Sequence, residues 1–348
     1  MSTIFVSIAS YRDIRCMKTV HEIFEKAMHP HNVYIGICQQ NKEHTEDCLD
    51  EEIISKYKDN IRILRLSYTE ARGPTYARYL CAQLFDNQDY FLQIDSHNLF
   101  TRDWDQKCID MMTLLEQHDP SKKYVLSHYP PTYDEQVSDS DNKHVTHISK
   151  CFFNDEGLIS FHGAVYREPK QLPQRNAFVA AGFIFARGEM VHEVPYDPYL
   201  PYLFAGEEIL LSIRLFTNGY DVYTPNRNIV FHAYTRSDEP KFWDDHRLDS
   251  RDAVEKVKYI MGIHQDLTLI QDKTVRDSIA DYGLGTQRTA QEFFHFIGVD
   301  LTNKTIDPSI EFFSTNHDVN LRVTEQLLLL FIFFLVLLCF FRLLRVHP

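Results

Sequence analysis

Residues 90–97 read YFLQIDSH, and this stretch decides the fold prediction. Tyr90, Phe91, Leu92 and Ile94 form the apolar run of a buried strand, which leads directly into the triplet Asp95-Ser96-His97. Residues at i and i+2 of an extended chain point to the same side, so the carboxylate and the imidazole face one point. Together these groups suit a divalent ion such as Mn²⁺. A triplet of this form also occurs by chance, often as a strand-end turn that caps a helix.

Apolar clusters alternate with helix-like stretches through the first hundred residues, the pattern of an α/β domain with a largely parallel sheet. We predict strands at residues 4–8, 33–38, 61–66 and 90–94, and helices at 16–28, 43–58 and 76–85. In such sheets ligands collect at the carboxyl ends of the strands. That rule places residues 10–13, 72–78 and 95–97 on one rim. The polar stretch 134–143 is predicted to be a mobile loop.

The composition is that of a folded protein with few basic residues. The 348 residues include 36 Lys or Arg against 49 Asp or Glu, a net charge of −13, which argues against a general nucleic-acid binder. The seven cysteines form no CxxC pair and are odd in number. We therefore predict reduced, mostly structural thiols and a reducing compartment.

The two ends of the chain differ. The N-terminus lacks a basic segment followed by a long apolar run, so it does not resemble a signal peptide. Residues 327–341 are fifteen consecutive apolar residues, followed by Arg342 and Arg345. With both arginines reaching the interface, residues 327–346 extend about 30 Å, the thickness of a hydrocarbon core. The alternative is a buried core helix.

The membrane interpretation gives three segments. They are a catalytic domain at residues 1–315, a linker at 316–326 and a C-terminal transmembrane anchor at 327–346. An anchor at this end is inserted after synthesis, so we expect the catalytic domain to face the cytoplasm. The basic residues on the far flank run against the usual positive-inside bias.

Several stretches carry a resemblance to a known family. Asp103-Trp104-Asp105 follows the Asp95 triplet, and further matching stretches lie at 4–13, 71–78, 93–97, 181–185, 204–208, 225–232 and 282–288. In this order they resemble nucleotide-sugar-dependent glycosyltransferases of the GT-A fold, a Rossmann-like mixed sheet flanked by helices. The closest resemblance, over residues 4–300, is to the cytoplasmic polypeptide N-acetylglucosaminyltransferases that glycosylate hydroxyproline.

The resemblance implies a UDP-sugar donor, UDP-N-acetylglucosamine (UDP-GlcNAc) in that family, and a divalent metal, Mn²⁺ or alternatively Mg²⁺. It also implies retention of the anomeric configuration. Asp95 and His97 would hold the metal with His232, which ends the apolar run 228–231. A lone histidine after such a run is more often simply packed. Asp95 would also meet the donor through that metal.

The same resemblance assigns donor contacts and acids. Ser7, Ser10 and Arg12 would meet the uridine, and Arg72 and Arg78 the phosphates or the sugar. For Arg78 a helix-surface arginine is the alternative.

The paired acids Glu207 and Glu208 open a helix at 209–217, where carboxylates are also stabilised by the helix dipole. We expect only one of the two to face the cleft, with a slight preference for Glu208.

Residues 180–185 are predicted to line the sugar and acceptor site, with Gly182 allowing close approach. The acceptor is expected to be a hydroxyl group on a protein or a glycan. Two alternatives remain at this point: a nucleotide-sugar hydrolase that uses the same triplet, and an inactive, membrane-tethered scaffold.

Overall fold

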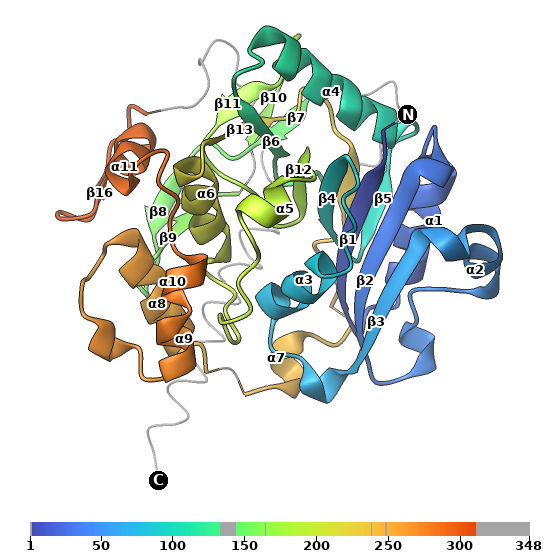
Figure 1. The fold of residues 1–348 in the computed structure, drawn as a ribbon, viewed down its shortest axis with the longest axis horizontal. Helices are drawn as coiled ribbons and strands as arrows, with labels where there is room; N and C mark the ends of the chain where they lie inside the picture. Colours follow the sequence, from blue (N-terminus) through green and yellow to red (C-terminus); the bar gives the residue numbers. More distant parts are fainter. Residues whose placement is uncertain (1, 133–143, 164, 238, 248, 311–348) are drawn as a thin grey trace. The chain divides into compact units, whose positions relative to one another are not determined.

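The computed structural model describes residues 2–132, 144–163, 165–237, 239–247 and 249–310 (Figure 1). Its centre is an eight-stranded mixed sheet in the order β11-β13-β6-β12-β4-β1-β2-β3. The strands are β1 (Ile4–Tyr11), β2 (Val33–Asn41), β3 (Ile61–Ser67), β4 (Tyr90–Asp95), β6 (Lys123–Ser127), β11 (Gln174–Asn176), β12 (Phe183–Arg187) and β13 (Tyr220–Thr224).

The first four strands of the sheet are parallel, as predicted. β1 pairs with β2 and β4, and Ala9 lies opposite Asp95 at the carboxyl end. The largely parallel sheet predicted from the apolar pattern is wrong beyond β4, because β12 is antiparallel to both β4 and β6, and β11 is antiparallel to β13. Apolar strand patterns do not encode direction, whereas the mixed sheet that the resemblance implied is confirmed.

Alternate residues of the central strands face two apolar layers. Ile4, Val6 and Ile8 of β1 pack with α1 (Cys16–Lys26) and α4 (Trp104–His118). Phe5 faces the opposite layer, which includes residues of α5 (Met190–Glu193) and α6 (Glu207–Thr217). A sheet covered on both faces requires near-continuous apolar strands, as residues 4–8 and 90–94 have.

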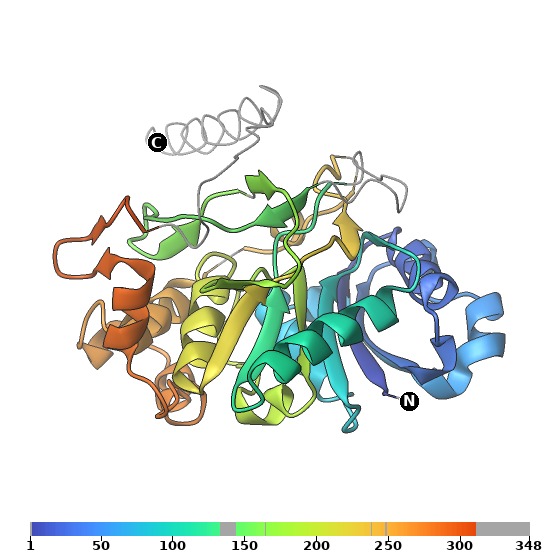
Figure 2. The same ribbon diagram turned by 90° about the horizontal axis from the view of Figure 1, so that it is seen from above.

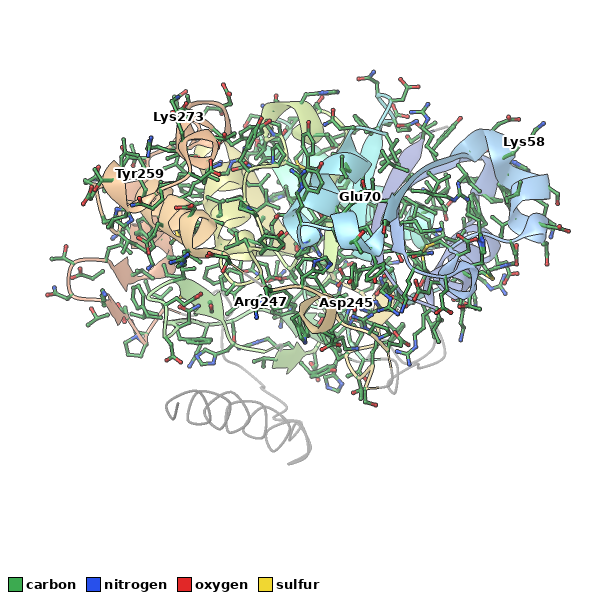
Figure 3. All side chains as sticks on the ribbon, turned by 90° about the horizontal axis from the view of Figure 1, so that it is seen from below. Lys58, Glu70, Asp245, Arg247, Tyr259 and Lys273 are labelled. Atoms are coloured by element: carbon green, nitrogen blue, oxygen red, sulfur yellow. A yellow bond between two sulfur atoms is a disulfide. The ribbon has the colours of Figure 1, made fainter. Side chains whose placement is uncertain are left out.

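The remaining elements surround this sheet. Figure 2 shows β1–β3 with α1 and α2 toward one end and α8–α11 toward the other, and in Figure 3 Lys58 and Lys273 lie near these two ends. The helices are α2 (Glu51–Tyr57), α3 (Pro74–Ala82), α7 (Phe242–Asp245), α8 (Arg251–Met261), α9 (Lys273–Asp277), α10 (Ile279–Tyr282) and α11 (Ala290–Ile297). Four short antiparallel pairs are β5 (Asn98–Phe100) with β14 (Val230–His232), β7 (Val145–His147) with β10 (Val165–Arg167), β8 (Cys151–Phe153) with β9 (Ile159–Phe161), and β15 (Val299–Asp300) with β16 (Thr305–Ile306).

The predicted helix at 43–58 is not continuous. The structure has a short 3₁₀ turn at His44–Glu46, and α2 begins only at Glu51. Asp50 caps α2 by accepting a hydrogen bond from the Ile53 amide at 2.9 Å. An aspartate is a strong N-cap residue, so the chain leaves the helical path before position 50 and starts again there.

The prediction that the cysteines are reduced is wrong for one pair. Cys16 of α1 and Cys48 form a disulfide, whereas Cys38, Cys81, Cys108 and Cys151 are free and buried. The pair is separated by 32 positions along the chain, so only the packing of the loop before α2 against α1 brings the two sulfurs together. The cellular compartment stays a prediction.

Within the described ranges, no helix combines the length and the apolar character needed to cross a membrane. The predicted linker at 316–326 and anchor at 327–346 lie outside the described residues, as does the predicted loop at 134–143.

Candidate active site

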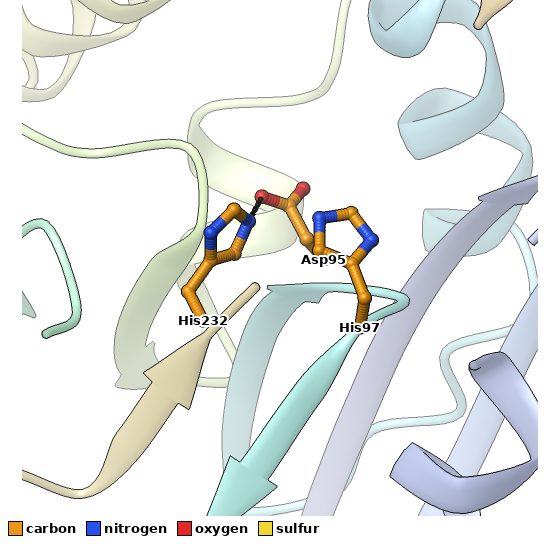
Figure 4. A group of neighbouring side chains, drawn as sticks. All are labelled: Asp95, His97 and His232. Carbon is orange, nitrogen blue, oxygen red and sulfur yellow. Dashed lines mark hydrogen bonds and ion pairs between the residues drawn. The ribbon is translucent and has the colours of Figure 1, made fainter. Parts of the chain in front are cut away.

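Two histidines and a carboxylate converge where β4 and β14 end. One ligand atom from each of Asp95, His97 and His232 lies within 4.8 Å of the other two. Figure 4 shows the Asp95 carboxylate between the two imidazole rings. Nε2 of His232 is 3.0 Å from Oδ2 of Asp95, and the two ring centroids are 4.5 Å apart. Two imidazole nitrogens and a carboxylate oxygen form a donor set that suits a transition-metal divalent ion.

The fold brings His232 to this point through a short sheet. Asn98 of β5 pairs with His232 of β14, and the Ala233 amide donates a hydrogen bond to the His97 carbonyl at 3.1 Å. β5, which directly follows Asp95 and His97 in the chain, therefore also aligns His232. This explains how residues 137 positions apart can serve one ion.

Asp13 orients His97, a role that sequence reasoning missed. Nδ1 of His97 lies 2.7 Å from Oδ2 of Asp13, and the Ser96 hydroxyl donates to the same oxygen at 2.6 Å. With the carboxylate as acceptor, the hydrogen sits on Nδ1 and Nε2 keeps a free lone pair. The only sign in the sequence was an acid just after the first strand, on the predicted rim.

Burial and hydrogen bonding keep His97 and Asp13 in the protonation states that metal binding requires. Burial lowers the pKa of His97 to about 4, although the hydrogen bond to Asp13 raises it, so the imidazole is neutral. Burial alone would raise the pKa of Asp13, but the hydrogen bond from His97, the Arg236 charge and the hydrogen bond from Ser96 lower it well below the usual range. A neutral imidazole beside an ionised carboxylate is the arrangement that metal-binding histidines use.

Arg78 joins the Asp95 carboxylate to one of the paired acids. Its buried guanidinium donates to Oδ1 of Asp95 at 3.0 Å and to Oε1 of Glu207. Burial would raise the pKa of Asp95, but His232 and the Arg78 charge together lower it strongly. Asp95 is therefore ionised and fixed in direction.

The two acids at the start of α6 have different surroundings. Gly206, at a φ of 98°, turns the chain into the helix, a conformation that favours glycine. Glu207 pairs with Arg78, whereas Glu208 accepts hydrogen bonds from the Tyr129 hydroxyl at 2.5 Å and the Ala181 amide at 2.8 Å. Burial raises the pKa of Glu208 to about 7, although these two hydrogen bonds oppose the shift.

These groups line a cavity of about 440 Å³. Both Glu207 and Glu208 line it, so the expectation that only one faces the cleft is wrong. A Cβ added to Gly182 would lie 3.1 Å from Oδ2 of Asp95, so the glycine keeps this wall open beside the candidate metal ligands. The mouth is aromatic, with Tyr202, Phe204, Phe242 and Trp243 among the lining residues.

A comparison with protein-family models matches almost all of the described chain. The model described as "Glycosyltransferase (GlcNAc)" matches residues 3–57 and 52–303. The chain belongs to this glycosyltransferase family.

A solved structure shares the fold of this glycosyltransferase. GalNAc-T7, crystallised with UDP, GalNAc and Mn²⁺, matches with a TM-score of 0.58 at 17% identity, over 85% of this chain and 56% of its own. The chain thus spans little more than half of that protein. Staphylococcus aureus TarS in complex with UDP-GlcNAc reaches a TM-score of 0.47 at 13% identity, over 80% of this chain and 71% of its own. This TM-score is too low to establish a shared fold. No curated protein sequence matches significantly.

Four predicted donor contacts of the glycosyltransferase lie outside the cavity lining. Ser7 and Ser10 are buried in β1. Arg12 forms ion pairs with Glu46 and Asp245. The exposed Arg72 lies over the Tyr76 ring, 4.9 Å from its centroid. Their contacts with a donor stay predictions, without support from the cavity geometry.

Replacing Glu208 with glutamine should change how stability depends on pH. A folded pKa of about 7 against an ordinary 4.5 means that Glu208 contributes stability that is complete below pH 4.5 and is lost as the pH rises through 7. The loss amounts to roughly 3 kcal/mol. Urea unfolding of both proteins between pH 4.5 and 8 gives the difference in their free energies of unfolding, and the wild type should lose this amount relative to Glu208→Gln as the pH rises, since the buried histidines contribute equally to both. The exposed control Glu156→Gln should follow the wild type, and a Glu208→Gln profile that does so as well would contradict this account.

Replacing Asp13 with asparagine should weaken metal binding about 10- to 100-fold, because the partner that fixes the His97 ring is changed. Titration of Mn²⁺ in the presence of UDP, followed by the paramagnetic resonance of free Mn²⁺, measures the affinity. The exposed Asp59→Asn is the matched control. Equal affinity in wild type and Asp13→Asn would show that Asp13 does not position a metal ligand.

Proposed function

We propose that this glycosyltransferase transfers N-acetylglucosamine from UDP-GlcNAc to a hydroxyl acceptor, with a divalent metal held by Asp95, His97 and His232. The observation that carries the proposal is the convergence of these three side chains, within 4.8 Å of one another, in a cavity at the carboxyl ends of β1 and β4. Ligands of α/β sheets collect at this edge. Mn²⁺ is the ion we expect, with Mg²⁺ as the alternative.

Three observations support the donor and the metal. The family description names GlcNAc. GalNAc-T7, which shares the fold, was crystallised with UDP and Mn²⁺. The sequence also resembles hydroxyproline-linked N-acetylglucosaminyltransferases, and from that resemblance we propose a protein hydroxyl acceptor and retention of configuration.

The chain's own residues prepare the site. Asp13 keeps His97 in one orientation and tautomer, and Arg78 keeps Asp95 directed at the cavity. A bound divalent cation supplies positive charge against the departing UDP diphosphate. Gly182 leaves the wall beside Asp95 open for the sugar.

Glu208 adds a group that can change protonation near neutral pH. As a carboxylate it accepts a hydrogen bond from a sugar or acceptor hydroxyl, and when protonated it donates one. Groups that hold or release a proton are most effective when their pKa lies near the working pH. Its bond from Tyr129 keeps it at the cavity wall.

Membrane attachment through residues 327–346, with the catalytic domain facing the cytoplasm, is a further part of this proposal and rests on the sequence alone. Expression of the full-length chain followed by carbonate extraction tests it. Recovery in the membrane pellet, lost when Leu335 is replaced by arginine, is the expected result. Complete extraction of the unaltered chain would contradict it.

UDP release by the purified full-length chain tests the proposed reaction. The assay uses UDP-GlcNAc, UDP-GalNAc and UDP-glucose, each with Mn²⁺, with Mg²⁺ and with a chelator. We expect metal-dependent release that is fastest with UDP-GlcNAc. Rates independent of metal, or no release from any donor, would contradict the proposal. Mass spectrometry of the sugar product separates transfer from hydrolysis.

A further inference from the structure

Four aromatic side chains at the cavity mouth have no role in the proposed chemistry. This aromatic rim consists of Tyr202 and Phe204, from the loop before α6, and Phe242 and Trp243 of α7. Phe204 is 70% exposed and Trp243 is 44% exposed. Phe204 is the most exposed large apolar side chain among the residues that the structure describes. Exposed aromatic groups that line one cavity mark binding surfaces more often than scattered apolar residues do.

The inner half of the rim is packed and holds the outer half in place. Tyr202 stacks on Phe242 with ring centroids 6.0 Å apart, and Phe242 also contacts the Tyr11 ring edge-on at 5.3 Å. Tyr202 has a φ of 57°, a costly conformation for a side chain of this size, and its amide donates to the Arg72 carbonyl at 2.9 Å. The loop is thus fixed in an unfavourable backbone state that presents Phe204 outward.

The outer pair forms a corner. The rings of Phe204 and Trp243 are 5.8 Å apart at an interplanar angle of 79°. The two rings touch edge to face, and the corner beside them suits a compact apolar side chain, whereas a sugar ring stacks on one flat face and needs polar partners for its hydroxyls. Lys241 also lines the cavity, and its ammonium group donates one of its three N–H bonds to the Arg236 carbonyl. The preference for an apolar group over a glycan therefore rests on the exposed rings of Phe204 and Trp243.

The rim is connected to the reacting centre by a short link. Phe204 precedes Glu207 by three positions, and both line the cavity. A ligand that reaches from the acids and candidate metal ligands to the rim must carry a hydroxyl at one point and an apolar group nearby. A polypeptide meets this requirement, because neighbouring side chains lie a few ångströms apart along an extended backbone.

We propose that the aromatic rim is a specificity site for the acceptor: it binds an apolar side chain that flanks the hydroxyl-bearing residue of a polypeptide, against the exposed faces of Phe204 and Trp243. This inference rests on the proposed function, since it requires a transferase. It assigns the rim to the acceptor side, and it predicts selectivity for the residues around the modified hydroxyl.

The test measures sequence preference in transfer by the full-length chain. The probe is a library of random nonapeptides with serine, threonine or hydroxyproline at the centre, incubated with UDP-GlcNAc and Mn²⁺. Modified peptides are identified by mass spectrometry, and N-acetyllactosamine is offered in parallel. The expected result is enrichment of apolar residues at one or more flanking positions.

Variants then connect the preference to the rim. For an enriched peptide, Phe204→Ala and Trp243→Ala should each lower kcat/KM by at least about tenfold, mainly through a higher KM. For a peptide with alanine at the flanking position, the same substitutions should lower kcat/KM far less. Phe204→Leu should restore part of the preference. Leu269→Ala, which removes another exposed apolar side chain outside the cavity lining, should match the wild type.

The outcomes separate this inference from the proposed function. Modified peptides with no flanking preference, or a preference that persists in both alanine variants, would overturn the rim's role. Transfer to N-acetyllactosamine alone, or UDP release without any transferred sugar, would also overturn it while the donor assignment stands. No UDP release from any donor would remove the proposed function, and this inference with it.

Discussion

Replacing Asp95 with asparagine should lower the rate of UDP release from UDP-GlcNAc by at least about a thousandfold. This corresponds to about 4 kcal/mol of lost transition-state stabilisation. Asparagine keeps the size of the side chain but removes the charge that faces His232 and the cavity. Without that charge the proposed divalent ion would be held more weakly and would no longer neutralise the leaving diphosphate. Steady-state UDP release, at an Mn²⁺ concentration that just saturates the wild type, measures the effect.

The same variant should lose the thermal stabilisation that Mn²⁺ and UDP together give the wild type. Asp110→Asn is the matched control, because Asp110 is exposed on α4 and should leave both properties at the wild-type level. An Asp95→Asn rate within tenfold of the wild type, with the stabilisation intact, would exclude Asp95 as a metal ligand.

Replacing Arg78 with methionine should lower the free energy of unfolding by about 3–5 kcal/mol. The buried guanidinium joins Asp95 and Glu207, so its removal leaves two carboxylates close together without a counter-charge. Guanidinium chloride unfolding at neutral pH measures the loss. Arg187→Met is the control: its pair with Glu116 is partly exposed, and removal should cost less than about 1 kcal/mol.

The pH dependence of the Arg78 variant has a defined direction. In the wild type the pKa of Asp95 is lowered, so its contribution to stability is present above the ordinary carboxyl pKa and is lost only as the pH falls through the lower folded value. The variant lacks the part of this contribution that the Arg78 charge supplies, so its deficit is largest at neutral pH and shrinks in acid as the carboxyls take up protons. Equal losses in Arg78→Met and Arg187→Met would contradict the structural role. A loss of UDP affinity alone would favour the phosphate contact predicted from the sequence.

The placement of Asp95 and His97 could be predicted because they directly follow the apolar run of β4, at the edge of a parallel sheet where ligands collect. His232 ends β14, which pairs with β5 in a separate antiparallel sheet, so its place in the site came from the resemblance. The i, i+2 spacing of the first two already directed them to one point. The alternation of apolar clusters predicted β1 to β4 in order, within a few residues at each end. These features depend on local pattern and on simple geometry.

Other features depend on contacts between distant segments, which local pattern does not encode. Arg78 was predicted to meet the phosphates or the sugar, with a helix-surface arginine as the alternative; the fold buries it between Asp95 and Glu207 at the cavity wall, and its contact with a donor stays a prediction. The Cys16–Cys48 disulfide and the Asp13–His97 hydrogen bond arise in the same way. The interruption before α2 was different, since Asp50 is a recognisable helix cap in the sequence.

A crystal structure of the full-length chain grown with UDP and Mn²⁺ tests the central claim most directly. Anomalous scattering from manganese locates the ion independently of the protein. We predict a single strong peak within bonding distance of Asp95, His97 and His232, with the UDP diphosphate on its open side. A nucleotide bound in this cavity with no ion between those three side chains, or manganese at another place, would contradict the account.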